Sequence, residues 1–169
     1  MIKIIATGKG GAGKTTVIAT LSRLLSRQGF RVLVIDTDPS MNLAMSLGIP
    51  FTTTRTLTED KIGIREQLLG DEPDDDNVHR HAHGHQYPVS IEKLLRLYEV
   101  FAQDNVRVLV MGTIPYGGAG CICSSISLVK ILIEQIASRT DRYDFVIIDS
   151  QAGSEILGRG LAVDFDFNL

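Results

Sequence analysis

The sequence has little of several features that would point to particular classes of protein. It holds two cysteines in 169 residues, too few for a disulfide framework, so a reducing cytoplasm is predicted. It has no apolar run of membrane-spanning length, and Met1 leads into a strand-like segment instead of a signal peptide. It has no excess of basic residues, because the net charge is −3 and the pI is near 5.8. We therefore expect neither a membrane nor nucleic acid as the main partner.

What remains is an ordinary soluble composition. Hydrophobic residues make up 44% of the chain and charged residues 22%, which is typical of a globular domain. A chain of 169 residues is long enough to bury a substantial core and short enough to form one domain.

A glycine-rich stretch near the N-terminus matches the pattern G-x-x-x-x-G-K-[ST]. It follows an apolar run at residues 2–6 and precedes a helical pattern at residues 14–28, which Gly29 closes. Strand, turn and helix in this order hold the phosphates of a nucleoside triphosphate on backbone N–H groups and a helix N-terminus. The predicted nucleotide-binding residues are Gly8, Lys9, Gly10, Gly11, Ala12, Gly13, Lys14, Thr15 and Thr16.

Two side chains of this stretch have predicted roles in binding ATP and Mg²⁺. Lys14 is expected to reach the β- and γ-phosphates, and the Thr15 hydroxyl is expected to bind Mg²⁺. The competing interpretation is a glycine turn with a surface lysine, which the strand–helix context disfavours.

Carboxylates end two of the predicted strands. The apolar run at residues 31–35 leads into Asp36-Thr37-Asp38-Pro39, and the run at residues 143–148 leads into Asp149. Ligands of α/β sheets bind at the carboxyl ends of the strands, and an acid at such a strand tip organises the Mg²⁺ water shell. The alternative for the first pair is an acidic turn that Pro39 terminates.

The remaining periodicity predicts an α/β fold, a doubly wound and mostly parallel sheet flanked by helices. Further helices are predicted at residues 41–47, 90–101, 124–138 and 155–162, and further strands at residues 106–111 and 165–169. We interpret residues 1–169 as one P-loop ATPase domain.

The two cysteines form a C-x-C pair, Cys121 and Cys123, in a glycine-rich loop ahead of a predicted helix. A helix N-terminus lowers the pKa of a thiol and favours the thiolate that binds metals such as Ni²⁺ or Zn²⁺. The alternative is that each cysteine is a small buried hydrophobe.

Residues 71–88 form an acidic, histidine-rich insertion. His79, His81, His83 and His85 alternate with other residues, so an extended segment would place them on one face, where they could hold Ni²⁺ or Zn²⁺. A disordered insertion without a specific ligand is the alternative, and both stay open.

The loop sequence K-G-G-x-G-K-T-T, with Lys9 as its early lysine, resembles the deviant Walker A loop of the ParA/MinD/nitrogenase-iron-protein class. This resemblance implies that Lys9 reaches the phosphates of the partner in a dimer, which makes Lys9, Lys14 and Asp38 the catalytic residues. It also implies that Asp38 orients the attacking water and that Asp36 contacts the Mg²⁺ shell, with switch II at residues 149–153.

Together with residues 110–123 and 152–160, the sequence resembles the CooC-type ATPases, which support nickel insertion into carbon monoxide dehydrogenase. The resemblance covers most of the chain apart from residues 52–103. It implies an ATP-dependent homodimer in which Cys121 and Cys123 of two protomers bind one Ni²⁺ or Zn²⁺, with that dehydrogenase as client. Two thiolates per chain agree with this, because two-fold symmetry supplies a second pair.

Two departures from that family stand out. Its members usually have a proline soon after the second cysteine, where this chain has Ser124 and Ser125. They also continue for several more elements, so the C-terminal strands of the sheet are expected to be missing here.

Three functions remain open on the sequence. The leading hypothesis is an ATP-hydrolysing metallochaperone. The alternatives are a positioning ATPase of the ParA/MinD kind and an ATP-gated electron donor with an iron–sulfur cluster between protomers, which thiolates would also suit.

Overall fold

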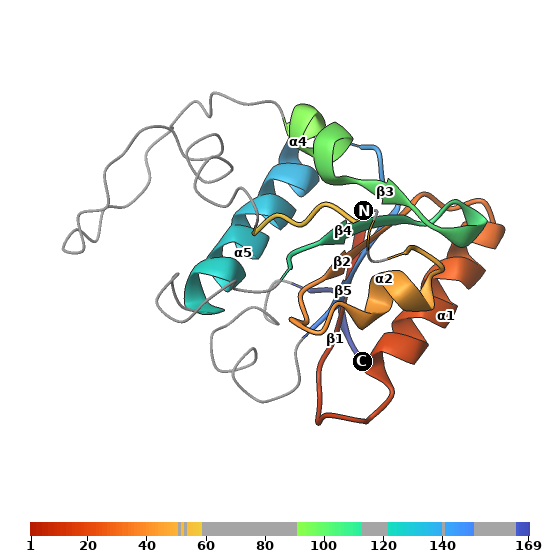
Figure 1. The fold of residues 1–169 in the computed structure, drawn as a ribbon. Coiled ribbons are helices and arrows are strands. Elements are labelled where there is room, and N and C mark those ends of the chain that lie inside the picture. Colours follow the sequence, from red (N-terminus) through yellow and green to blue (C-terminus); the bar gives the residue numbers. More distant parts are fainter. Residues whose placement is uncertain (51, 53, 59–90, 113–121, 140, 151–164) are drawn as a thin grey trace.

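The computed structural model describes residues 1–50, 52, 54–58, 91–112, 122–139, 141–150 and 165–169. From β1 to β2 and from β4 to β5, each pair of strands has a helix between its members in the chain (Figure 1). The strands are β1 (Ile2–Ala6), β2 (Val32–Asp36), β3 (Val100–Phe101), β4 (Arg107–Val110), β5 (Phe145–Asp149) and β6 (Phe167–Asn168). The helices are α1 (Lys14–Arg27), α2 (Asn42–Ser46), α4 (Ile91–Tyr98) and α5 (Ile122–Arg139), with a 3-10 turn at Gln103–Asn105.

The described strands form one sheet in the order β3-β4-β2-β5-β1-β6. Every neighbouring pair is parallel except β3 and β4, which are antiparallel. The chain therefore leaves β1, crosses over the position of β5 to form β2, and returns later to place β5 between them. This arrangement confirms the predicted doubly wound, mostly parallel sheet, and it brings the ends of β1, β5 and β2 side by side.

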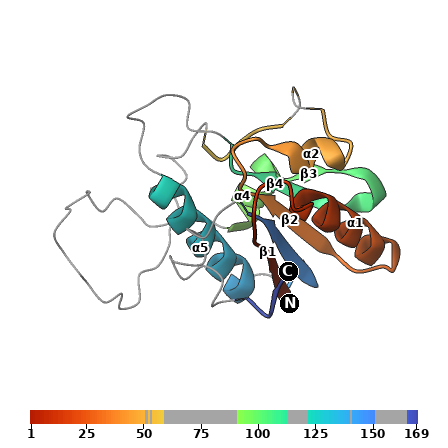
Figure 2. The same ribbon diagram turned by 90° about the horizontal axis from the view of Figure 1, so that it is seen from below.

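Helices cover both faces of the sheet, as Figures 1 and 2 show from two directions. One face packs against α1 and α2 through Ile18, Leu43 and Leu47, and the other packs against α4 and α5 through Leu95 and Leu132. Neighbouring strand residues alternate between the two cores: in β5, Ile147 joins the α1/α2 side while Val146 and Ile148 join the α4/α5 side. The central strands are apolar on both faces because both faces are covered.

Most element boundaries lie within two residues of those predicted, and two differences matter. The helix predicted at residues 90–101 is wrong at its end, because α4 stops at Tyr98 and residues 100–101 form β3 against β4. The helix predicted at residues 124–138 starts earlier, at Ile122. No proline or glycine from Ile122 to Ser125 prevents the helix from beginning there.

Two of the predicted segments cannot be compared with the structure. The helix predicted at residues 155–162 and the insertion at residues 71–88 lie outside the described residues. Within the described part of the chain, no helix is both long enough and apolar enough to cross a membrane.

A buried carboxylate joins the elements around the amino ends of two strands. Glu99, whose side chain is 3% exposed, lies 2.8 Å from Arg107 Nε and 3.0 Å from Arg142 Nη2. The Tyr143 hydroxyl donates a 3.2 Å hydrogen bond to Glu99 Oε2. Because these partners lie at the start of β4 and just before β5, Glu99 fixes the end of α4 to the sheet.

We expect Glu99→Gln to destabilise the protein strongly, because it leaves two partly buried guanidinium groups without their carboxylate. The expected loss in free energy of unfolding is about 3 kcal/mol or more, measured by urea denaturation. Asp144→Asn is the control, since the side chains of the Arg31–Asp144 pair are 52% and 34% exposed and losing this pair is expected to cost about 1 kcal/mol. Equal losses in the two variants would contradict this assignment.

Candidate functional site

The phosphate loop connects β1 to α1 and is open to solvent. Gly8, Gly11 and Gly13 have φ values of 141°, 75° and 87°, which side chains with a Cβ rarely adopt. Residues 9–13 are exposed. Helix α1 begins at Lys14 without a side-chain cap and without an acidic residue in its first turn. Its first N–H groups and its positive end therefore stay available to an anion.

The two lysines of the loop lie in different environments. Lys14 is half-buried, and its Nζ donates hydrogen bonds to the carbonyl oxygens of Gly8 at 3.2 Å and Lys9 at 3.3 Å. The lysine thus closes the loop on itself, and its ammonium group is already held inside the curve of the backbone. The side chain of Lys9 is exposed, in the position that a reach to a second molecule requires.

The parallel register brings the loop and two of the predicted carboxylates together. Ala6, the last residue of β1, pairs with Asp149 of β5, and Asp149 pairs with Asp36 of β2. The amide and the hydroxyl of Thr37 both donate to the Asp149 carbonyl, at 3.0 and 2.9 Å. The Ser150 hydroxyl donates to the Ala6 carbonyl. The three strand ends therefore form one connected edge.

Asp149 is a buried acid at the carboxyl end of β5. It is 1% exposed, and neither carboxylate oxygen accepts a hydrogen bond from the described residues. Burial raises the pKa of Asp149, while the nearby Thr15 hydroxyl and Lys14 charge oppose that shift. Unpaired buried oxygens beside a phosphate loop fit a magnesium ion and its water shell.

Asp36 differs from Asp149, because both of its oxygens are occupied. It is fully buried, Oδ1 accepts the Asp38 amide at 3.1 Å, and Oδ2 accepts the Leu43 amide at 3.1 Å. The second bond satisfies the first turn of α2, whose own N-cap residue Met41 provides no side-chain cap. Burial, followed by the charge of Asp149, raises the pKa of Asp36 to about 7 despite these two donors.

Asp38 lies in the turn that Asp36 holds. Its Oδ1 accepts bonds from the Ser40 amide at 2.9 Å and the Ser40 hydroxyl at 2.6 Å. The residue is half-buried at the same carboxyl edge as the phosphate loop. The structure therefore brings together the loop, Asp36, Asp38 and Asp149. The predicted contact of Asp36 with the Mg²⁺ shell stays a prediction, and the side chain also braces the loop that carries Asp38.

Of the predicted transition-metal ligands, the structure describes Cys123 alone. Cys121 and the four histidines lie outside the described residues. Cys123 belongs to the first turn of α5, so the prediction that both cysteines precede the helix is wrong for the second one. Among the described residues, no group of three or more His, Cys, Asp and Glu could hold a metal ion.

Sequence reasoning missed the side chains that tie the site together. Thr37 and Ser150 bond across strands to backbone carbonyls, and Leu43 gives its amide to Asp36. The positions of Thr37 and Ser150 beside the two acids were the available signal, but their partners lie in other strands. Met41, with φ of 50°, had no such signal.

Comparison with known proteins agrees with this geometry. Residues 3–158 match the family described as the CobQ/CobB/MinD/ParA nucleotide binding domain. The carbon monoxide dehydrogenase accessory protein CooC of Rhodospirillum rubrum is 35% identical over 94% of this chain. The chain spans 58% of the length of that relative.

Two solved structures share the fold and were determined with bound nucleotide. The septum site-determining protein MinD of Pyrococcus horikoshii, complexed with Mg-ADP, has a TM-score of 0.56 and 27% identity, over 90% of this chain and 50% of that chain. Cobyrinic acid a,c-diamide synthase of Mycobacterium smegmatis, with ADP and magnesium, has a TM-score of 0.55 and 25% identity, over 89% of this chain and 51% of that chain.

Asp149 and Asp36 are expected to respond differently to replacement by asparagine. Asp149→Asn removes the unpaired charge and is expected to weaken Mg²⁺ binding in the presence of ADP by about tenfold or more. Asp36→Asn is expected to weaken Mg²⁺ binding less than Asp149→Asn does, and to speed amide exchange in α2, because its NH₂ group cannot accept the bond that one oxygen accepted. Calorimetric titration and hydrogen exchange measure these effects, and equal weakening of Mg²⁺ binding would contradict the difference.

The buried acids also predict how stability depends on pH. A folded-state pKa raised from 3.8 to about 7 means that Asp36 contributes stability fully below its unfolded pKa and loses it as pH rises through the folded pKa. Between these values we expect Asp36 to lower the free energy of unfolding by up to about 1.4 kcal/mol per pH unit. In Asp36→Asn, the free energy of unfolding is expected to fall less steeply with pH over this range. Urea denaturation at a series of pH values measures this.

Asp144→Asn is the matched control for this pH series. Hydrogen bonds from Arg31 lower the pKa of Asp144 to about 2, so its linkage acts in acid, as pH falls below the unfolded pKa. At higher pH, the free energy of unfolding of Asp144→Asn is therefore expected to change with pH as steeply as that of the parent protein. If the free energy of unfolding of Asp36→Asn depended on pH in the same way as that of the parent protein, Asp36 would not be the group that causes the pH dependence.

Proposed function

The chain belongs to the CobQ/CobB/MinD/ParA nucleotide-binding family, and on this premise we propose that it is an ATPase acting as a metallochaperone for nickel insertion into carbon monoxide dehydrogenase. The predicted resemblance to CooC-type ATPases is confirmed by the relative from Rhodospirillum rubrum. One structural observation carries the ATPase part of the proposal. The open phosphate loop lies beside Asp149, a buried carboxylate whose oxygens have no donor in the described part of the chain.

The described residues divide the work of binding and hydrolysis. Exposed N–H groups of the loop and the start of α1 bind the phosphates, and Lys14 exchanges its two loop carbonyls for phosphate oxygens. Thr15 and Asp149 would hold Mg²⁺ with its water shell, and the bound ion would offset the charge of the β- and γ-phosphates. Asp38, held by the Asp36-anchored turn, orients the attacking water.

A second protomer completes this site in the proposal. Lys9 is exposed on the rim of the loop, so its ammonium group can reach the phosphates bound by a partner. A cation supplied in this way stabilises the charge that develops on the transferred phosphoryl group. ATP therefore binds more tightly between two protomers than to one, and hydrolysis releases the dimer.

The cargo site in the proposal consists of Cys121 and Cys123 from both protomers. Helix α5 begins at Ile122, so its positive end lies at the C-x-C pair and favours thiolates. Four thiolates from two chains suit Ni²⁺ or Zn²⁺. We assign the protein to the cytoplasm, where a reducing environment keeps these thiols free. The histidines at positions 79–85 remain a predicted second metal-binding segment.

A ParA/MinD-type positioning ATPase is the second candidate, favoured by the likeness to MinD of Pyrococcus horikoshii. The two functions differ in what ATP controls. ATP-dependent pelleting with lipid vesicles or DNA would favour positioning, whereas ATP-dependent metal release would favour the metallochaperone. A charge-transfer absorbance after anaerobic reconstitution with iron and sulfide would favour the electron donor instead.

Replacing both cysteines tests the metallochaperone directly. Cys121→Ser with Cys123→Ser is expected to abolish Ni²⁺ and Zn²⁺ binding and to leave ATP binding unchanged, because the phosphate site uses other residues. Asp38→Asn is the reciprocal control, expected to stop hydrolysis while metal and ATP binding persist. Metal content by mass spectrometry and ATP binding by calorimetry provide the readouts. An unchanged metal stoichiometry in the double variant would exclude this cargo site.

A further inference from the structure

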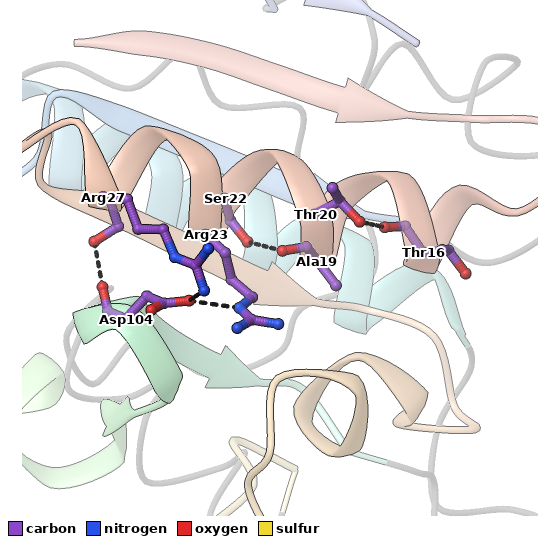
Figure 3. Close-up of polar contacts among 8 residues, drawn as sticks. Thr16, Ala19, Thr20, Ser22, Arg23, Arg27 and Asp104 are labelled. Atoms are coloured by element: carbon purple, nitrogen blue, oxygen red, sulfur yellow. Dashed lines mark hydrogen bonds and ion pairs between the residues drawn. The ribbon is translucent and has the colours of Figure 1, made fainter.

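A groove with a mixed polar and apolar lining runs along the outer side of α1, away from the carboxyl edge of the sheet. Its volume is about 520 Å³. We call it the α1/α2 groove; it is lined by Thr16, Ala19, Thr20, Arg23, Leu24 and Arg27 of α1 and by Ser46 of α2. Figure 3 shows its polar side chains along α1 and the approach of Arg23 and Arg27 to Asp104. Thr16, at one end of the groove, is the one lining residue that also belongs to the predicted nucleotide site, and the arginines lie at the other end of α1.

One carboxylate serves both arginines of the groove. Asp104 Oδ2 lies 2.6 Å from Arg23 Nε and 3.0 Å from Arg27 Nη2. Two guanidinium groups against one carboxylate leave an excess positive charge, and these side chains are 34% and 60% exposed. Within the described residues, no other acid contacts either guanidinium. Several N–H donors are therefore available to a ligand.

The position of this charge is fixed by the fold. Asp104 has a φ of 57° in the 3-10 turn between β3 and β4, and its carbonyl accepts a 2.7 Å bond from the Ser26 hydroxyl of α1. The carboxylate is thereby held against the middle and end of α1, and the two arginines converge on it. Their remaining donors are arranged before any ligand arrives, which lowers the entropic cost of binding.

Apolar side chains border the charged end. Leu24 is 52% exposed in the groove, Val17 is 50% exposed about two turns earlier on α1, and Met45 is 59% exposed beside Ser46. The exposed leucine inside the groove and the exposed methionine beside its Ser46, together with the two arginines, make a surface that fits a segment with both apolar and acidic side chains. Arginine and methionine are enriched at protein interfaces.

The charge distribution of the chain selects among possible anionic partners. The first 35 residues contain six basic residues and no Asp or Glu, while the whole chain has a net charge of −3. A long polyanion such as DNA experiences the whole field of the protein, which is negative. A short acidic peptide experiences chiefly the local field of the groove, because charges beyond about 8 Å are screened at physiological salt. The observations therefore favour a peptide.

We propose that the α1/α2 groove is a docking site for a short acidic segment of a partner protein. The carboxylates of that segment pair with Arg23 and Arg27, and its apolar side chains pack on Leu24 and Met45. The partner thus attaches to the same helix that presents Lys14 and Thr15 to the nucleotide. This proposal stands apart from the metal site, since it requires neither cysteine.

A labelled synthetic peptide tests the docking site. The probe is a peptide of alternating glutamate and leucine, measured by fluorescence anisotropy against the full chain, with a glutamine-for-glutamate peptide as the matched control. The glutamate peptide is expected to bind, and more weakly at high salt. Arg27→Gln is expected to weaken binding by about fivefold, as an exposed ion pair would. Arg31→Gln, which alters an arginine paired with Asp144 outside the groove, is expected to change nothing.

Asp104→Asn separates a binding role of the arginines from a purely structural one. Asparagine tolerates the left-handed backbone of this position, and the change releases both guanidinium groups from their carboxylate. Peptide binding is therefore expected to become severalfold tighter, whereas arginines that only brace the turn would give weaker binding. Labelled ADP is expected to bind equally to all these variants, which keeps the result separate from the nucleotide site.

Specific outcomes would overturn the proposal. These are no binding of the glutamate peptide to the parent protein, equal binding of the glutamine peptide, or weaker peptide binding in Asp104→Asn. Duplex DNA or anionic vesicles that bind in an Arg27-dependent way where the glutamate peptide does not would assign the groove to a different class of partner.

Discussion

Asp149 carries a carboxylate into the centre of the sheet edge, where burial denies it water and the described residues offer no donor to its oxygens. Burying a carboxylate without hydrogen-bond donors costs free energy of folding. Its position is imposed by β5, the strand that lies between β1 with its phosphate loop and β2 with Asp36. The same register that stabilises the sheet therefore places a buried carboxylate, which accepts no hydrogen bond from the described residues, beside an anion-binding loop. A divalent cation with bound phosphates fits this arrangement, because the cation pairs with the carboxylate and the phosphates bind to the loop.

Buried acids at the amino ends of the strands have different partners from buried acids at the carboxyl ends. At the amino ends, Glu99 is surrounded by two guanidinium groups and a tyrosine hydroxyl, so its charge is matched and its role is structural. At the carboxyl ends, among the described residues, Asp36 accepts hydrogen bonds from two backbone amides and Asp149 accepts none. Strain of this kind gathers at sites that bind ligands. The contrast marks the carboxyl edge as the functional one without reference to any relative.

Several parts of the site could be read from the sequence because their signals are local. The spacing from Gly8 to Thr15 and the acids after two apolar runs depend on neighbours in the chain, and the structure places them as expected. The end of α4 could not be read, because residues 100–101 leave the helical pattern to pair with β4. The bracing of α2 by Asp36 was equally hidden, since the amide it accepts lies seven residues away across a turn. The groove on α1 depends on Asp104, which is distant in sequence from both arginines.

The sequence by itself determined the class of fold and the chemistry of the phosphate loop, because hydrophobic period and glycine spacing act over short stretches of chain. It also determined that acids would stand at strand ends. Only the tertiary structure decided which of them stays unpaired. Asp36 receives its donors from the turn that follows it in the chain, whereas the strand order sets β5 between β1 and β2 and places Asp149, with no donor from the described residues, beside the phosphate loop. Strand order is a long-range property, so no local pattern encodes it.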